Sequence, residues 1–262
     1  MELPIFIIDA FAERTLAGNP AAVCPLESWL PEQTMQAIAA EMNLAETVFF
    51  TPEPQSERFA IRWFTPTREV DLIGHATLAA GHLVLERLQV GAKAVHFVSG
   101  ADEFIVARAG DMLWLEMPAL PPRAINAPPT LAKALGRAPK TVLAAKHYLC
   151  LYDSPADVAA LAPDMAALAA LDLPAIIVSA PGEGEFDFVS RFFAPANGVP
   201  EDHVSGVAHL CLAPFWAERL GKPALVGRQL SRRGGTVRCE HLGTRVRLGG
   251  RAAIFLDGQI TI

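Results

Sequence analysis

The chain has 262 residues, of which 52 % are hydrophobic and 19 % are charged, and its formal net charge is −6 at pH 7. This length and composition allow a substantial buried core and exclude wholesale disorder. The acidic balance argues against a broad surface for nucleic acid or for an anionic membrane, so we expect neither as a partner.

The N-terminal segment and the cysteines indicate a cytoplasmic protein. The apolar run in MELPIFIIDAF is too short for a signal peptide, and Glu2 stands where such a peptide carries positive charge. No run of apolar residues is long enough to predict a membrane span. The four cysteines are scattered without a Cys-x-x-Cys pair, so we expect free thiols.

Strands dominate the structure expected before residue 118. Short apolar or alternating runs such as IFIIDAF, TVFFTP, FAIRWFTP and MLWLEMP are bounded by Gly, Pro and acidic residues, as strands usually are. Two helices interrupt them. The first follows Pro31, and Met35 and Ile38 lie on its apolar face; the second covers 75–88 and is apolar on nearly every side. A helix that is apolar all round is a buried helix.

A proline-rich segment separates two halves of similar composition. Residues 118–130 contain five prolines and little periodicity, which is typical of a linker. Strand-like runs resume after it, around one helix at 206–220 that is again apolar on most sides. The sequence therefore predicts an α+β protein with an N-terminal half at 1–118 and a C-terminal half at 131–262, the last strand being free to return to the N-terminal half. Each half is expected to be a curved sheet around one buried helix.

The two halves also share a sequence pattern. The segments that begin at Arg62 and Arg191 both read Arg-aromatic-Phe-x-Pro, then a polar loop with an acidic residue, then Gly-x-Ala and an apolar helix ending in Glu-Arg-Leu. The glycine follows the arginine by 12 residues in the first segment and by 15 in the second. This common order predicts two related halves.

Both apolar helices open with glycine, at Gly74-His75 and at Gly206-Val207. The N-terminus of a helix offers unpaired N–H groups and a partial positive charge, and glycine lets a ligand approach the backbone closely. The pattern therefore predicts that these two helix starts bind a carboxylate or another anion.

Several motifs resemble the phenazine-biosynthesis PhzF-like family. They are GNPAAV, NLAETVFF, RWFTPTREVDLIGHATLAA, SRFFAP, EDHVSGVAH and QLSRRGG, which follow one another from residue 18 to residue 235. The resemblance implies the diaminopimelate epimerase-like fold, with two barrel-like halves related by a pseudo-twofold axis. It also implies a cofactor-independent isomerase of biosynthetic type that moves a proton on a small carboxylate-bearing substrate, and a homodimer.

The resemblance assigns roles to particular residues of this chain. It implies that Glu46 transfers the proton and that His75 and Asp202 assist. From sequence alone, a glutamate placed like Glu46 is most often a solvated surface charge, and His75 is as often an ordinary buried histidine as a functional one. An aspartate placed like Asp202 is commonly a helix cap. The residues expected to bind substrate are Asn19, Gly74, Ser205, Gly206 and Val207.

Other features leave a second function open. Diaminopimelate epimerases carry a cysteine before each helix-opening glycine, but this chain has Ile73 and Ser205 there, which argues against thiol-based racemisation. The family's second motif is altered at His203, Ser205 and Val207. A catalytically inactive relative that binds a small carboxylate, or regulates, is therefore the alternative. No metal-ligand spacing or dinucleotide fingerprint is present, so we expect neither metal nor cofactor.

Overall fold

The computed structural model describes residues 1–71 and 73–262, which form two compact units. Unit 1 comprises Met1–Glu116 together with Gly249–Ile262, and unit 2 comprises Met117–Leu248. The units therefore divide at two points of the chain, and the C-terminal segment belongs to unit 1.

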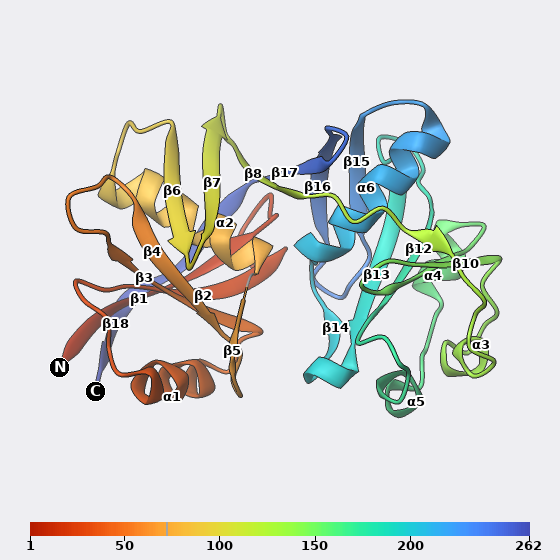
Figure 1. The fold of residues 1–262 in the computed structure, drawn as a ribbon, viewed down its shortest axis with the longest axis horizontal. Coiled ribbons are helices and arrows are strands. Elements are labelled where there is room, and N and C mark those ends of the chain that lie inside the picture. The colour runs from red at the N-terminus through yellow and green to blue at the C-terminus, as the bar shows by residue number, and fades with distance from the viewer. Residues whose placement is uncertain (72) are drawn as a thin grey trace. The chain divides into compact units, whose positions relative to one another are not determined.

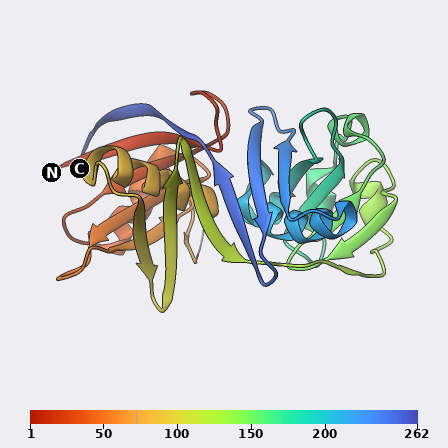
Figure 2. The ribbon, with the colours of Figure 1, turned by 90° about the horizontal axis from the view of Figure 1, so that it is seen from above.

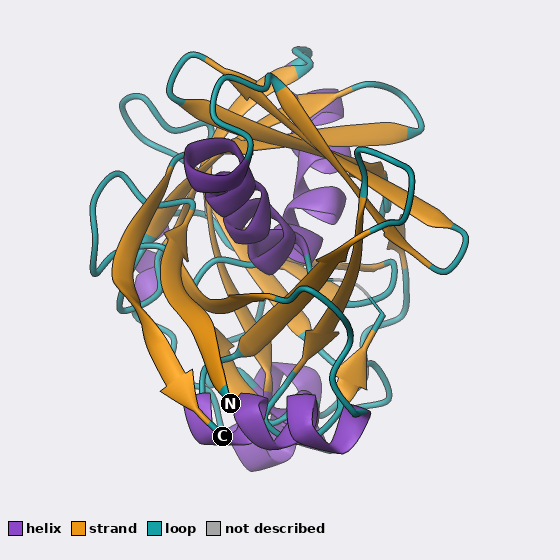
Figure 3. Ribbon diagram, turned by 90° about the vertical axis from the view of Figure 1, so that its left-hand side faces the viewer, coloured by secondary structure: helices purple, strands orange, loops and turns teal. Residues whose placement is uncertain are grey.

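Unit 1 is a curved sheet with one helix on each face (Figures 1 and 3). Its strands are β1 (Glu2–Ala10), β2 (Asn19–Pro25), β3 (Glu46–Pro52), β4 (Phe59–Phe64), β5 (Glu69–Val70), β6 (Ala94–Ser99), β7 (Asp102–Ala109), β8 (Met112–Pro118) and β18 (Ala252–Thr261). Its helices are α1 (Glu32–Met42) and α2 (Gly74–Leu83), and α2 continues into a π-helical turn, η1 (Val84–Leu88). Every residue of α2 except His82 is buried, and α2 packs against β1, β2, β3 and β7. The predicted buried helix at 75–88 is thus α2 and η1 together.

The last strand joins unit 1 through a long antiparallel pairing. β18 pairs with β1 from Glu2↔Thr261 to Ala10↔Ala252, and the two strands lie side by side in Figures 1 and 2. The main-chain N–H of Ile262 donates to the carbonyl of Met1 at 2.9 Å. This pairing satisfies the backbone of β1 along an edge that would otherwise be open.

Unit 2 has a second curved sheet, with α6 on one face and three short helices on the other. Its strands are β9 (Arg123–Ala124), β10 (Thr141–Ala144), β11 (Tyr148–Leu151), β12 (Ile176–Pro181), β13 (Phe188–Ala194), β14 (Val199–Asp202), β15 (Ala224–Gln229), β16 (Gly235–His241) and β17 (Arg245–Gly250). Its helices are α3 (Leu131–Ala134), α4 (Pro155–Ala159), α5 (Met165–Ala169), a 3-10 turn η2 (Pro195–Asn197) and α6 (Gly206–Leu220). Residues 118–130, expected to be a linker, include β9, which pairs with β10. Among the described residues, no helix is long and apolar enough to cross a membrane.

The two sheets repeat the same strand order and register. In unit 1, β2 and β3 are parallel, β3 and β4 are antiparallel, and β4 and β6 are parallel. In unit 2, β11 and β12 are likewise parallel, β12 and β13 antiparallel, and β13 and β15 parallel. The matched pairs include Thr47↔Phe64 with Ile176↔Phe193, and Ala22↔Thr47 with Tyr148↔Ile176. The paired residues of these four strands therefore have counterparts in the other unit, as the repeated sequence pattern predicts.

Candidate functional site

Glu46, His75 and Asn19 lie together in unit 1. Glu46 begins β3, Asn19 begins β2, and His75 is the second residue of α2. Oε2 of Glu46 lies 3.1 Å from Nε2 of His75, and Nδ2 of Asn19 donates to Nδ1 of the same ring at 3.2 Å. The three residues are 7 %, 3 % and 0 % exposed. The structure thus joins three candidates that are far apart in the sequence.

The strand register explains this meeting. β2 and β3 are parallel, and Glu46 is paired with Ala21, two residues beyond Asn19. Alternate side chains of a strand share a face, so Asn19 lies on the same face as Ala21. Because Glu46 contacts His75 of α2, the carboxylate of Glu46 lies on the face of the sheet that α2 covers. The first turn of α2 then supplies the imidazole.

The hydrogen bond from Asn19 fixes the position of the ring proton on His75. An amide nitrogen can only donate, so Nδ1 of the neutral imidazole accepts and the proton is on Nε2, beside Glu46. Nε2 and Oε2 are close enough for an ion pair, but their directions do not make a hydrogen bond, and no described donor bonds to Oε2. A buried carboxylate oxygen with this remaining capacity can accept a proton from a ligand.

The first turn of α2 is also arranged to receive a ligand. Among the described side chains, none caps this helix, whose N-cap residue is the apolar Ile73. Gly74 is buried and adjoins His75. The N–H groups of this turn therefore lie directly beside the pair formed by Glu46 and His75.

The other candidates lie around the start of α6 in unit 2. Asp202 ends β14 and is half-buried, Gly206 is buried, and Val207 is half-buried. Ser205 is the N-cap of α6 and is 2 % exposed; its Oγ accepts from the N–H of Ala208 at 3.4 Å. Unlike α2, α6 thus has a side-chain cap, which leaves fewer of its N–H groups for a ligand.

A buried glutamine that we did not predict holds this loop. Gln229 is fully buried at the end of β15; its Oε1 accepts from the N–H of Ser205 at 2.9 Å, and its Nε2 donates to the carbonyl of Asp202 at 2.7 Å. Ser231 strengthens the same loop by donating to the carbonyl of His203 at 2.6 Å. Both residues belong to the motif QLSRRGG, but only the folded structure shows what they bind.

In α2 and in α6, a side chain of the first turn hydrogen-bonds to the carbonyl of the residue that precedes the helix-opening glycine. Oγ1 of Thr77 lies 2.8 Å from the carbonyl of Ile73, and Nδ1 of His209 lies 2.7 Å from the carbonyl of Ser205. Burial lowers the pKa of His209 to about 4, and the bond to Ser205 opposes this only in part. His209 is therefore neutral at pH 7 and donates through Nδ1.

The described residues contain no group of three or more His, Cys, Asp and Glu that could hold a metal ion. The four cysteines are free and buried. Burial raises the pKa of Cys24, Cys150 and Cys211 to about 12, so these thiols stay protonated at neutral pH and are poor nucleophiles.

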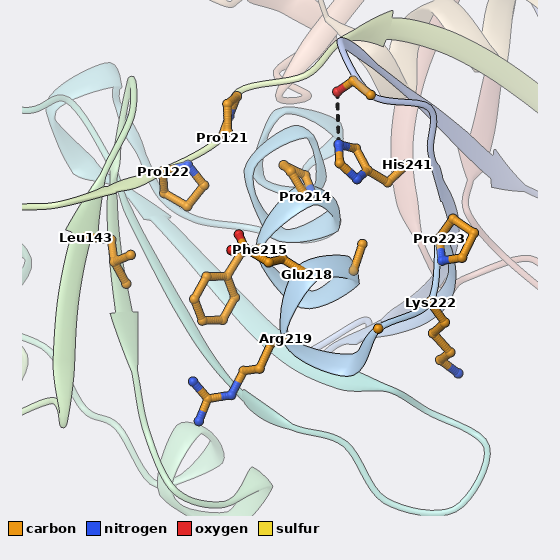
Figure 4. Close-up of a pocket in the computed structure, with 13 residues that line it drawn as sticks. Pro121, Pro122, Leu143, Pro214, Phe215, Glu218, Arg219, Lys222, Pro223 and His241 are labelled. Carbon is orange, nitrogen blue, oxygen red and sulfur yellow. Dashed lines mark hydrogen bonds between the residues drawn. The ribbon is translucent and has the colours of Figure 1, made fainter.

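A pocket of unit 2 lies away from these residues (Figure 4). It encloses about 890 Å³ beside the C-terminal half of α6, and its lining includes Pro121, Leu143, Phe215, Arg219, Lys222 and His241. Lys222 pairs with Asp187 at 2.6 Å, and Nε2 of His241 lies 2.9 Å from the carbonyl of Gly243. No candidate residue lines this pocket, so its size alone does not make it the functional site.

Comparisons with known proteins agree on one family. The profile described as "Phenazine biosynthesis-like protein" matches residues 8–258. An uncharacterized isomerase of Pseudomonas aeruginosa is 45 % identical over 260 residues, covering 99 % of each chain. The crystal structure of a PhzF-family phenazine biosynthesis protein from Enterococcus faecalis is 41 % identical, with a TM-score of 0.96 and complete coverage of both chains. A hydroxyproline epimerase from Agrobacterium vitis shares the fold alone. It is 11 % identical, with a TM-score of 0.59, and the match covers 99 % of this chain and 91 % of the epimerase chain.

These findings confirm two of the predictions. The α+β fold of two similar halves, each a curved sheet around a central helix, is the fold of the PhzF and epimerase structures. The relatives also confirm the reaction class, that of an isomerase.

Proposed function

Because the chain belongs to the phenazine biosynthesis-like (PhzF) family, we propose that it moves a proton within a small carboxylate-bearing substrate and needs no cofactor to do so. The observation that carries this proposal is the 3.1 Å contact between Glu46 and His75 in a buried setting beside the first turn of α2. Glu46 removes a proton from one carbon of the substrate and returns it at another atom. The substrate and the product then have the same composition, as an isomerisation requires.

The residues around Glu46 stabilise charge, hold the tautomer of His75 and bind the substrate in this proposal. His75 presents its Nε2–H beside the carboxylate and stabilises the negative charge that develops when the substrate loses its proton. Asn19 holds that tautomer of His75. The N–H groups at Gly74 bind the carboxylate of the substrate, which keeps the reacting carbon close to Glu46.

In this proposal the start of α6 in unit 2 is a second candidate position for binding a carboxylate. Gly206 and Val207 offer N–H groups at the start of α6, and Asp202 supplies a carboxylate on the loop before it. Ser205 and Gln229 fix the backbone of that loop. The altered motif here favours the second candidate function, a relative that binds a carboxylate but does not isomerise it. A cytoplasmic location and a homodimer stay predictions.

Proton exchange in D2O tests the proposal. A panel of small carboxylic acids is screened by thermal shift, and each acid that stabilises the protein is followed by NMR for deuterium incorporation, with wild type beside Glu46→Gln. The glutamine keeps the shape of the side chain but cannot accept the proton, so exchange should fall by about 10²–10⁴-fold while binding is retained. Equal exchange in both proteins would remove Glu46 from the mechanism. Binding without exchange in the wild type would establish the carboxylate-binding relative instead.

A further inference from the structure

A chain of hydrogen bonds within unit 1 ends at the peptide that opens α2. The indole Nε1–H of Trp63 in β4 donates to Oγ1 of Thr77 at 3.1 Å. The hydroxyl of Thr77 in turn donates to the carbonyl of Ile73 at 2.8 Å, and the main-chain N–H of Thr77 donates to the same carbonyl at 3.0 Å. Trp63 and Thr77 are 1 % and 0 % exposed, so solvent water does not compete for these bonds.

Trp63 fixes the direction in which the hydroxyl of Thr77 donates. A hydroxyl group can donate or accept and rotates to suit its neighbours, whereas an indole N–H can only donate. Because Trp63 donates to Oγ1, the hydroxyl proton of Thr77 is left for the carbonyl of Ile73. The indole is itself held by Phe104 of β7, whose ring centroid lies 5.6 Å away at an interplanar angle of 86°.

The carbonyl that receives both bonds shares a peptide unit with the N–H of Gly74. A trans peptide is planar, and its C=O and N–H point in opposite directions, so holding the carbonyl of Ile73 also holds the N–H of Gly74. Hydrogen bonds to the carbonyl of a peptide also strengthen its N–H as a donor. This N–H lies in the first turn of α2, which no described side chain caps, next to His75. The buried Oε2 of Glu46, to which no described donor bonds, lies beside the same turn.

Unit 2 keeps the bond to this carbonyl but makes it with other residues. The third residue after the helix-opening glycine is Thr77 in α2 and His209 in α6, and Nδ1 of His209 lies 2.7 Å from the carbonyl of Ser205. The matching registers of β3 with β4 and of β12 with β13 make Phe192, which has no donor, the counterpart of Trp63. An imidazole N–H has a fixed direction and needs no second group to orient it. The indole donor is therefore present in the unit whose helix uses a hydroxyl.

We propose that Trp63 and Thr77 are positioning residues of the carboxylate site, which hold the peptide between Ile73 and Gly74 so that the N–H of Gly74 points at the carboxylate of the substrate. This rests on the proposed function, in which that N–H binds the carboxylate. Both side chains are buried and do not touch the substrate themselves. They act on carboxylate binding and not on the proton that Glu46 transfers, so their loss raises KM and changes kcat little.

Titration with acetate tests this proposal. The nitrogen and proton shifts of the Gly74 amide are followed by NMR in the full chain and give the dissociation constant at this N–H. Thr77→Val removes the hydroxyl at nearly constant shape, Thr77→Ser keeps it, and Trp63→Phe removes the N–H but keeps an aromatic ring. The control Trp216→Phe removes a similarly buried indole N–H of unit 2, which donates to Oγ of Ser179 at 3.0 Å. Thermal unfolding establishes which variants are folded, and either Thr77→Val or Trp63→Phe suffices for the test.

We expect wild type, Thr77→Ser and Trp216→Phe to bind acetate with equal affinity. Thr77→Val should bind it about threefold to tenfold more weakly, which is the worth of one hydrogen bond. Trp63→Phe should lose about twofold to fivefold, because the hydroxyl remains but is no longer oriented. For the acid of the panel that exchanges fastest, KM should rise by the same factors, with kcat within about twofold of the wild type.

Three results would overturn the positioning role. Equal acetate affinity in wild type, Thr77→Val and Trp63→Phe, alongside Glu46-dependent exchange, removes it and leaves the proposed function intact. A loss in Trp216→Phe as large as that in Thr77→Val also removes it, because the effect then follows from lowered stability. If the Gly74 amide of the wild type does not respond to acetate, the carboxylate binds elsewhere and the positioning role is wrong; if no acid of the panel exchanges either, the proposed function is wrong as well.

Discussion

Glu46, the first residue of β3, corresponds to Ala175, the residue directly before β12, when the register of the two repeated sheets is extended by one position, and one carries a carboxylate where the other carries a methyl group. The difference extends to the adjoining helix, where His75 in α2 corresponds to Val207 in α6. A proton-transferring residue must be ionisable, so at these matched positions only unit 1 carries a group that can perform the step. We therefore expect catalysis to be most sensitive to substitutions around Glu46.

Replacement of Asn19 should slow proton exchange through its effect on His75. Asn19→Ala removes one hydrogen bond to Nδ1, and we expect a loss of about tenfold in the exchange rate. Asn19→Asp should cost more, on the order of 10²-fold, because a carboxylate draws the ring proton to Nδ1 and leaves Nε2 without its proton beside Glu46. The exchange rate is measured by NMR in D2O, and the nitrogen shifts of His75 report the tautomer. Asp and Ala variants of equal activity would contradict this role.

The sequence predicts the class of fold because its signals are local and repeated. The Arg-aromatic-Phe-x-Pro pattern marks β4 and β13, and the glycines mark the starts of α2 and α6. Apolar residues on all sides of both helices indicate that each is buried within a sheet. These features depend only on neighbouring residues, so they are visible without a structure.

The contacts of the candidate site are less visible in the sequence. Nothing near Glu46 in the sequence indicates that it meets His75, because the packing of α2 against β2 and β3 brings them together. Gln229 shows no hydrophobic period or motif spacing that would reveal its two bonds to the loop before α6. Family resemblance, and not residue pattern, indicates the roles of Glu46 and His75. Packing between segments that are far apart in the sequence decides these contacts, and local patterns do not encode it.

Gly227 should tolerate no side chain while Phe188 is present. The two residues are paired between β13 and β15, and a Cβ added to Gly227 would lie 2.4 Å from Cζ of Phe188, whose ring stacks on Trp216. We expect Gly227→Ala to lower the free energy of unfolding by about 1–3 kcal/mol through overpacking. In a Phe188→Leu background the same change should cost less, because the shorter side chain leaves room. Chemical denaturation of the four proteins gives the coupling, and strictly additive losses would contradict the clash.

Arg191 should contribute more to stability than its counterpart Arg62. The side chain of Arg191 is 12 % exposed, binds Glu201 through two nitrogens at 2.7 and 3.0 Å, and donates to the carbonyl of Leu161 at 2.8 Å. Arg62 is 26 % exposed, and its partners are the more exposed Glu69 and Glu32. Lysine cannot make the bidentate contact or reach several acceptors at once. We expect Arg191→Lys to cost about 2 kcal/mol and Arg62→Lys less than about 1 kcal/mol in urea denaturation. Equal losses would show that burial does not distinguish the two arginines.

His209 should make the protein less stable in mild acid. Burial holds its pKa at about 4 in the folded state, whereas the ordinary value in an unfolded chain is 6.5. As the pH falls through 6.5, the unfolded chain binds a proton that the folded chain does not bind until about pH 4, so the free energy of unfolding declines across this window. For this one group the decline from pH 7.5 to pH 5 is about 2 kcal/mol. The measurement is urea denaturation at both values of pH.

The matched variants for this prediction are His209→Asn and His96→Asn. Asparagine at 209 places an N–H donor where Nδ1 of the imidazole bonds to the carbonyl of Ser205, but it does not titrate. We expect the His209→Asn protein to be less stable at pH 7.5, because the smaller side chain leaves space beside Phe188. Its free energy of unfolding should nevertheless fall by about 2 kcal/mol less than that of the wild type between pH 7.5 and pH 5. The side chain of His96 is 44 % exposed, so the exchange for asparagine there should leave the decline nearly unchanged. If the free energy of unfolding falls equally in His209→Asn and in the wild type between the two values of pH, His209 is not the group that destabilises the protein in mild acid. The acid sensitivity would then come from another histidine such as His147, which is half-buried and whose pKa burial also lowers to about 4.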